Sequence, residues 1–181
     1  MTQDEVYILK ASLKDRKRIW RRIEIKGNQT LRDFDDVLRE AFKHDHEDHL
    51  SGFFSGDAWK SKQLGVIEPY GGGTNSKKKI SKLDLLEGTT IEYVYDFGDN
   101  IQHVIKLEKI VDSIPGTNYP RITSQNKPKY QYCVACEKIQ KNSVATWICI
   151  ECSSEKQENV LLCDDCLDEE HPDHYAEELL F

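Results

Sequence analysis

Two stretches near the start of the chain have the composition of strands, and the second alternates between apolar and polar residues around one slip, as a half-buried strand does. Residues 6–13 and 18–25 are rich in β-branched and aromatic side chains, which favour the pleated surface of a sheet. Charged residues around Asp15 separate the two stretches. The pattern predicts two strands joined as a hairpin, with part of a basic cluster on its outer face.

A longer apolar stripe follows at the spacing of a helix. Thr30 is placed to cap this helix, with Asp33 three residues later as its capping-box partner. One face is apolar and consists of Leu31, Phe34, Val37, Leu38, Ala41 and Phe42. The outer face is charged and consists of Arg32, Asp35, Asp36, Arg39 and Glu40. We therefore expect one amphipathic helix over residues 31–43, packed on the sheet through its apolar stripe.

Strand patterns return in the middle of the chain. Residues 50–54 predict a short strand, and residues 89–95 and 101–111 predict a hairpin with a glycine-containing turn. Residues 56–79 show no regular pattern. The glycines at 71–73 precede three lysines but lack the order of a phosphate-binding loop, so a mobile loop is expected there. The order of elements predicts an α+β fold with a largely antiparallel sheet and one main packed helix.

The last quarter of the chain carries its most specific chemistry. All six cysteines occur there as three C-x-x-C pairs, and an H-x-x-H pair follows them. A C-x-x-C turn lets two thiolates share one small cation, and two such pairs complete a tetrahedral Zn²⁺ site. The pattern therefore predicts two zinc ions, with Cys133, Cys136, Cys149, Cys152, Cys163, Cys166, His171 and His174 as ligands.

Other chemistries are compatible with the same residues. Six cysteines can form three disulfides, although thiols in a cytosol are kept reduced. A tetrahedral thiolate site can also hold iron in place of zinc. The spacing does not decide which pairs share an ion, because neighbouring pairs can combine, or the first pair can join the third and the second pair the fourth.

The order of these pairs resembles cross-brace zinc fingers of the ZZ and B-box type. The likeness covers residues 130–176, and the stretch LLCDDC at 161–166, with the two histidines after it, carries most of it. The resemblance implies the interleaved pairing, with one Cys₄ site and one Cys₂His₂ site. We expect a small zinc-stabilised module at 133–181, a proline-containing linker at 114–132 and a larger domain at 1–113.

Charge is unevenly distributed along the chain. The formal net charge is −7 and the sequence pI is about 5.4. The zinc segment is strongly acidic, which suits a basic partner. A basic cluster near the start consists of Lys14, Arg16, Lys17, Arg18, Arg21 and Arg22.

Two further features bear on the location of the protein. No run of about 18 apolar residues occurs, so no membrane span is expected. The first residues, Met-Thr-Gln-Asp-Glu, do not have the pattern of a secretory leader. We therefore expect a cytoplasmic protein.

The central hairpin carries a second resemblance. Its motif is YVYDFGD at 93–99 with His103 four residues on, accompanied by the helix at 31–42 and by His49-Leu50 leading to Phe53. Over residues 1–127 the chain resembles the Ri-plasmid ORF-three-like (pRiA-type) domain family, also labelled insertion-element passenger TnpR-like. The resemblance implies a compact α+β domain of bacteria, archaea and mobile elements, with no settled biochemical activity.

These observations lead to one favoured function and one alternative binding function. We favour a non-enzymatic interaction protein, in which the acidic zinc module binds a basic peptide or protein partner. The alternative is a nucleic-acid-binding protein of mobile-element type, in which Arg18, Arg21 and Arg22 on the basic hairpin contact phosphates.

A third hypothesis is a metal-dependent enzyme built on the turn between Asp96 and His103. Asp96, Asp99 and His103 could bind a divalent ion or relay protons, with the histidines and acids at 44–49 as further candidates. The competing explanation is that the two carboxylates accept hydrogen bonds within the turn and that His103 packs on the sheet.

Overall fold

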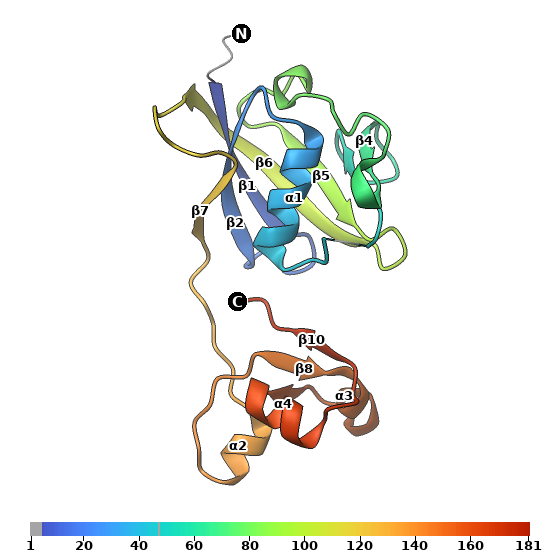
Figure 1. The fold of residues 1–181 in the computed structure, drawn as a ribbon, viewed down its shortest axis with the longest axis vertical. Coiled ribbons are helices and arrows are strands. Elements are labelled where there is room, and N and C mark those ends of the chain that lie inside the picture. The colour runs from blue at the N-terminus through green and yellow to red at the C-terminus, as the bar shows by residue number, and fades with distance from the viewer. Residues whose placement is uncertain (1–4, 47) are drawn as a thin grey trace. The chain divides into compact units, whose positions relative to one another are not determined.

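The computed structural model describes residues 5–46 and 48–181 and divides into two compact units, Met1–Asn126 and Lys127–Phe181. We describe each unit by itself (Figure 1). The first unit contains β1 (Glu5–Leu13), β2 (Trp20–Lys26), α1 (Leu31–Phe42), β3 (Ser51–Phe54), β4 (Gln63–Ile67), β5 (Thr90–Tyr95), β6 (Ile101–Asp112) and β7 (Arg121–Gln125), with short 3₁₀ turns at Pro69–Gly71 and Ile80–Lys82.

One seven-stranded sheet forms most of the first unit. Its strand order is β4-β3-β5-β6-β1-β2-β7, and every neighbouring pair is antiparallel. Helix α1 lies across one face of this sheet (Figure 1). The predicted α+β class, with a largely antiparallel sheet and one main helix, is confirmed.

Helix α1 begins as its sequence predicts. The Thr30 hydroxyl accepts a hydrogen bond from the Asp33 amide, and the Asp33 carboxylate accepts one from the Thr30 amide at 2.6 Å. This reciprocal capping satisfies two amides that a helix start otherwise leaves unpaired. The apolar stripe is buried, with the ring of Phe34 stacked on that of Phe53 at 5.4 Å.

The charged face of α1 differs from the prediction at two positions. Asp35 and Arg39 are buried rather than outside, with side chains 0% and 2% exposed. They lie one turn apart and form an ion pair, with Arg39 Nε donating to Asp35 Oδ2 at 2.8 Å. The prediction was wrong because the chain after α1 folds back over this side of the helix, and the helical period alone does not reveal that cover.

In the large sheet, two strands were missed by the sequence analysis, β4 and β7. Both are short edge strands of five residues. Strand β4 falls in the stretch without a regular pattern, and β7 lies in the predicted linker, where it pairs with β2. An edge strand is paired along one side only, so its sequence is less constrained than that of a central strand.

The second face of the sheet is covered unevenly. Beside β3 and β5, residues Phe54, Ala58 and Val94 form a small apolar cluster with Phe97. Where β6, β1 and β2 lie side by side, the same face carries longer polar side chains, among them Lys10, Arg22 and Lys106, each partly or fully exposed.

The second unit is a small three-stranded sheet with three short helices. Its elements are α2 (Val134–Lys138), β8 (Trp147–Cys149), α3 (Ile150–Lys156), β9 (Val160–Leu162), α4 (Asp164–Glu170) and β10 (Ala176–Glu178), with sheet order β10-β8-β9. Five of the seven residues in its buried cluster are cysteines. Its interior is therefore built around thiols rather than around aliphatic side chains.

Within the described residues, 5–46 and 48–181, none of the helices is long and apolar enough to cross a membrane.

Candidate metal centre

The eight predicted ligands come together as two groups of four. One group is Cys133, Cys136, Cys163 and Cys166, and the other is Cys149, Cys152, His171 and His174. In each group the candidate ligand atoms all lie within 4.8 Å of one another. The first pair thus joins the third, and the second pair joins the fourth, which is the interleaved arrangement of a cross-brace.

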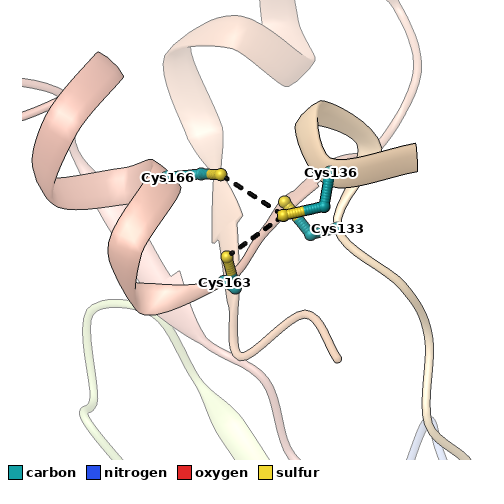
Figure 2. A group of neighbouring side chains, drawn as sticks. All are labelled: Cys133, Cys136, Cys163 and Cys166. Atoms are coloured by element: carbon teal, nitrogen blue, oxygen red, sulfur yellow. Dashed lines mark hydrogen bonds between the residues drawn. The ribbon is translucent and has the colours of Figure 1, made fainter. Parts of the chain in front are cut away.

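Helix starts position the four sulfurs of the first group. Cys133 is the N-cap of α2 and Cys163 is the N-cap of α4, and Cys136 and Cys166 lie in the first turns of those helices. The four side chains point toward a common centre from the two helices (Figure 2). Helix N-termini favour negative charge, so these positions suit thiolates.

The spacing of the sulfurs matches a tetrahedral metal site. Cys136 Sγ lies 3.8 Å from Cys163 Sγ and 3.6 Å from Cys166 Sγ. A tetrahedron with Zn–S bonds of 2.3 Å has sulfurs about 3.8 Å apart. A disulfide would need about 2.05 Å, and all six cysteines are free. The structure therefore contradicts the disulfide alternative.

The second group mixes sulfur and nitrogen. Cys149 ends β8 and caps α3, Cys152 lies one turn into α3, and the two histidines follow α4. Cys152 Sγ lies 3.4 Å from His171 Nδ1 and 3.3 Å from His174 Nδ1, and the two Nδ1 atoms are 3.3 Å apart. Ideal tetrahedral zinc geometry gives about 3.5 Å for S···N and about 3.3 Å for N···N.

Without a cation, burial raises the pKa of three of these thiols, those of Cys152, Cys163 and Cys166, whereas the pKa of Cys133 is lowered. Burial, followed by hydrogen bonds with Cys136 and Cys163, raises the pKa of the Cys166 thiol. A divalent ion at the centre inverts this preference, because a coordinated thiol is deprotonated. Both groups therefore have the residue types and the spacing of a metal site, and a cation would stabilise their thiolates.

Asp96 and His103, two residues of the predicted turn site, lie in different surroundings. Asp96 Oδ1 accepts hydrogen bonds from the amides of Gly98 and Asp99 at 2.8 and 3.3 Å, which are contacts within the turn. His103 is 0% exposed, and its ring meets that of Phe42 edge-on at 4.6 Å. Burial lowers the pKa of His103 to about 4. For Asp96 and His103 these contacts are the ones that the packing explanation expects.

His44 and His49 both pack against the ring of Tyr95 but differ in burial. His44 stacks on Tyr95 at 4.1 Å, and its Nε2 lies 3.1 Å from His103 Nε2. Burial, with a contribution from the neighbouring His103, lowers the pKa of His44 to about 2. His49 is more exposed, and its Nδ1 lies 3.0 Å from Asp96 Oδ2. Glu47 of this segment lies outside the described residues.

The three arginines of the predicted nucleic-acid contact do not share one surface. Arg18 is exposed in the β1–β2 connection. Arg21 is only 5% exposed and points to the helix side of the sheet, where its Nε donates to the Ala41 carbonyl at 2.9 Å. Arg22 points to the opposite face and pairs with Glu108 at 2.7 Å. Residues 21 and 22 alternate across the sheet because strand side chains have a period of two.

The structure also contains a buried polar network that sequence reasoning missed. Arg39 uses all five of its N–H donors: one on Asp35, three on the carbonyls of Asp45, Asp48 and His49, and one on the Ser51 hydroxyl. Asp35 Oδ1 accepts from Ser51 and from the Tyr93 hydroxyl. The one available signal was an Asp–Arg pair four residues apart on a helix.

A family model described as plasmid pRiA4b ORF-3-like protein matches residues 5–139. The chain belongs to this family. The match confirms the resemblance carried by the YVYDFGD motif. It also extends beyond residue 127, where that resemblance ended, and includes Cys133 and Cys136.

A solved structure supports the same fold. The chain is similar to the crystal structure of MM3350, a protein of unknown function from Methanosarcina mazei Go1, at 32% sequence identity and a TM-score of 0.56. The match covers 68% of this chain and 70% of that chain. None of the curated proteins compared with the chain matches it.

Proposed function

We propose that the second unit of this plasmid pRiA4b ORF-3-like protein binds two zinc ions and serves as a rigid module that recognises a basic peptide or protein. The agreement between the ligand spacing and tetrahedral geometry at both groups carries the metal assignment. All four positions around each ion are filled by protein, so neither ion keeps an open site for water, and the ions are structural rather than catalytic.

The interior of the module explains why it needs metal. Apart from cysteines, its buried cluster contains only Val160 and Leu162. Burying two aliphatic side chains contributes about 1.5–3 kcal/mol each. Ordering the backbone costs about 1–2 kcal/mol per residue. Summed over the residues of the unit, this cost is many times larger than the gain from burying Val160 and Leu162. Structural zinc supplies about 10–16 kcal/mol per site and offsets much of the difference.

The charge of the module indicates the partner. Residues 127–181 contain five lysines, no arginine and twelve acidic residues, so this unit accounts for the whole formal net charge of −7. Six thiolates and two Zn²⁺ ions add a further two negative charges. Helix α4 presents much of this charge, because Asp164, Asp165, Asp168, Glu169 and Glu170 are all exposed.

Exposed aromatic side chains accompany the acids. Tyr130, Tyr132 and Tyr175 are 56%, 49% and 63% exposed. Tyrosine is enriched in protein interfaces because it combines apolar area with one hydroxyl. An acidic surface with exposed tyrosines suits a Lys/Arg-rich segment of a partner.

Elemental analysis of the full chain, with hydrogen exchange before and after chelation, tests the metal assignment. We expect two zinc ions per chain, and chelation should expose the amides of residues 133–174 to exchange while the sheet of the first unit stays protected. Cys166→Ser should lower the zinc content, whereas Ser154→Ala on the exposed surface of the same unit should not. Protein without metal, or loss of protection throughout the chain, contradicts the proposal.

Partner recognition needs its own test. A fluorescent lysine- and arginine-rich peptide should bind the zinc-loaded chain, measured by anisotropy. Reversing Asp168, Glu169 and Glu170 to lysine should weaken binding about tenfold or more, because charge repulsion replaces attraction. The matched control reverses three exposed acids of the first unit, Asp57, Asp99 and Asp112. Equal loss in both variants would show nonspecific attraction and refute recognition by α4.

A further inference from the structure

A row of positive charges crosses the open face of the large sheet. The strand register places Lys106 of β6 opposite Lys10 of β1, and Lys10 opposite Arg22 of β2. Adjacent strands lie about 4.8 Å apart, so three cationic side chains stand side by side on one face. Like charges directly opposite each other destabilise a sheet, so folding alone does not favour this row.

A β-bulge widens the surface at the end of this row. The β1–β6 register shifts between Ile8 and Leu9, and Glu108 is the additional residue. Beside the bulge lies a cavity of about 450 Å³, lined by Ile8, Arg22, Gly88, Lys106, Glu108 and Lys109. This volume falls within the usual range for small-ligand sites, and bulges are enriched next to functional sites.

The positive charge is a local feature. Residues 1–126 contain twenty Lys/Arg and twenty Asp/Glu, so the first unit has no formal net charge. At the cavity, Lys10, Arg22, Lys106 and Lys109 accompany one carboxylate, Glu108, which forms an ion pair with Arg22. On the same face, Glu24 lies opposite Ile8 in the strand register and pairs with Arg121, and Glu92 pairs with Lys14. The row and cavity therefore keep a surplus of about three positive charges.

An aromatic ring borders the row. Lys10 Nζ lies 4.6 Å from the centre of the Trp20 ring, and the Arg22 guanidinium carbon lies 5.4 Å from it. The cavity itself has Ile8 and Gly88 among its lining residues. Positive charge next to apolar and aromatic surface fits a ligand that combines phosphates with planar bases.

We propose that this face of β6, β1 and β2 binds single-stranded nucleic acid, with phosphates on Lys106, Lys10 and Arg22 and a base in the cavity over Ile8. The open, gently twisted face of a sheet admits splayed bases, whereas a duplex keeps its bases stacked inside. The carboxylates of an acidic peptide would pair with the cations, but acidic side chains have no planar ring to fill the cavity or to contact Trp20. The site is independent of the zinc module and does not rest on its proposed function.

Fluorescence anisotropy of the full chain with a labelled mixed-sequence 12-nucleotide single strand, measured across a salt series, tests the proposal. The variant is Lys106→Glu with Lys109→Glu, both of which change exposed side chains. The matched control is Lys60→Glu with Lys62→Glu, which makes the same charge change at exposed positions elsewhere. We expect the cavity variant to bind at least tenfold more weakly than the control. The slope of log affinity against log salt should fall by about 0.7, because the variant removes one proposed phosphate contact, that of Lys106.

Three outcomes would overturn the proposal. Equal affinities for the cavity variant and the control would show that the strand binds elsewhere. Competition by a polyglutamate peptide as strong as that by an unlabelled strand would indicate an acidic-peptide site. Affinity for a mononucleotide equal to that for the 12-nucleotide strand would show a small-ligand cavity without recognition of a strand across the row.

Discussion

Replacing Arg39 with methionine should remove a large part of the stability of the first unit. The guanidinium of Arg39 donates to Asp35 at 2.8 Å and to the carbonyls of Asp45, Asp48 and His49 at 2.7, 2.8 and 3.0 Å. Its loss leaves the fully buried Asp35 carboxylate without its cation. Removing one partner of a buried ion pair costs about 3–5 kcal/mol. A domain of this size has a total unfolding free energy of about 5–15 kcal/mol.

The contacts of Asp35 set the expected behaviour of a double variant. In Arg39→Met the carboxylate keeps two hydroxyl donors, Ser51 and Tyr93, but not a positive charge. Adding Asp35→Asn removes the uncompensated charge, so the double variant should be more stable than the two single effects predict. We expect a coupling free energy of about 1–3 kcal/mol, because the two residues share one network.

Urea unfolding followed by tryptophan fluorescence measures these differences. Trp20 and Trp59 report on the first unit, and a Trp147→Phe background removes the signal of the second unit. Glu40→Gln, at an exposed position on the same helix, serves as the control and should change stability by less than about 0.5 kcal/mol. A loss below about 1 kcal/mol for Arg39→Met, or additive effects in the double variant, would refute the idea that this network holds residues 45, 48, 49 and 51 on the helix.

Two further predictions concern the same unit. Gly52→Ala should cost about 1–3 kcal/mol in thermal unfolding, because an added Cβ would lie 3.0 Å from Phe97 Cζ; if Phe97→Leu does not recover the loss, the crowding argument fails. Acidification should also destabilise the unit, since burial lowers the pKa of His103 to about 4 and that of His44 to about 2. The unfolded chain, with histidine pKa near 6.5, then binds more protons, so stability is full above about pH 6.5 and falls below it. His103 alone accounts for about 2 kcal/mol at pH 5. Urea unfolding that gives equal stability at pH 7.5 and pH 5 would contradict this account.

Local patterns were sufficient where a property depends on residues close together in sequence. The capping box of Thr30 and Asp33 and the apolar stripe of α1 follow from helix geometry. The alternation in residues 101–111 predicted β6 because side chains in a strand alternate between faces. The x-x spacing likewise marked all eight residues that the structure gathers into two groups, because a C-x-x-C turn brings its own two thiols together.

Longer-range properties required the tertiary structure. Asp35 and Arg39 were assigned to the solvent side of α1, but residues 45, 48, 49 and 51 bind Arg39 there, and a helical period contains no information about a later segment. Arg21 and Arg22 seemed to form one basic patch, although the pairing of β2 sends them to opposite faces. The short edge strand β7 was missed because its pairing with β2 joins residues about a hundred positions apart.

For this protein, sequence alone therefore determined which residues can bind metal, where the main helix begins and which segments form the central strands. These depend on side-chain type and on periods of two to four residues. Only the fold decided which pairs of candidate ligands come together. The fold also decided the burial of the Asp35–Arg39 pair and the row formed by Lys106, Lys10 and Arg22. Each of these features depends on strands or helices that are far apart in sequence but meet in space. Packing of the whole unit sets the register between such strands and the segments that cover them.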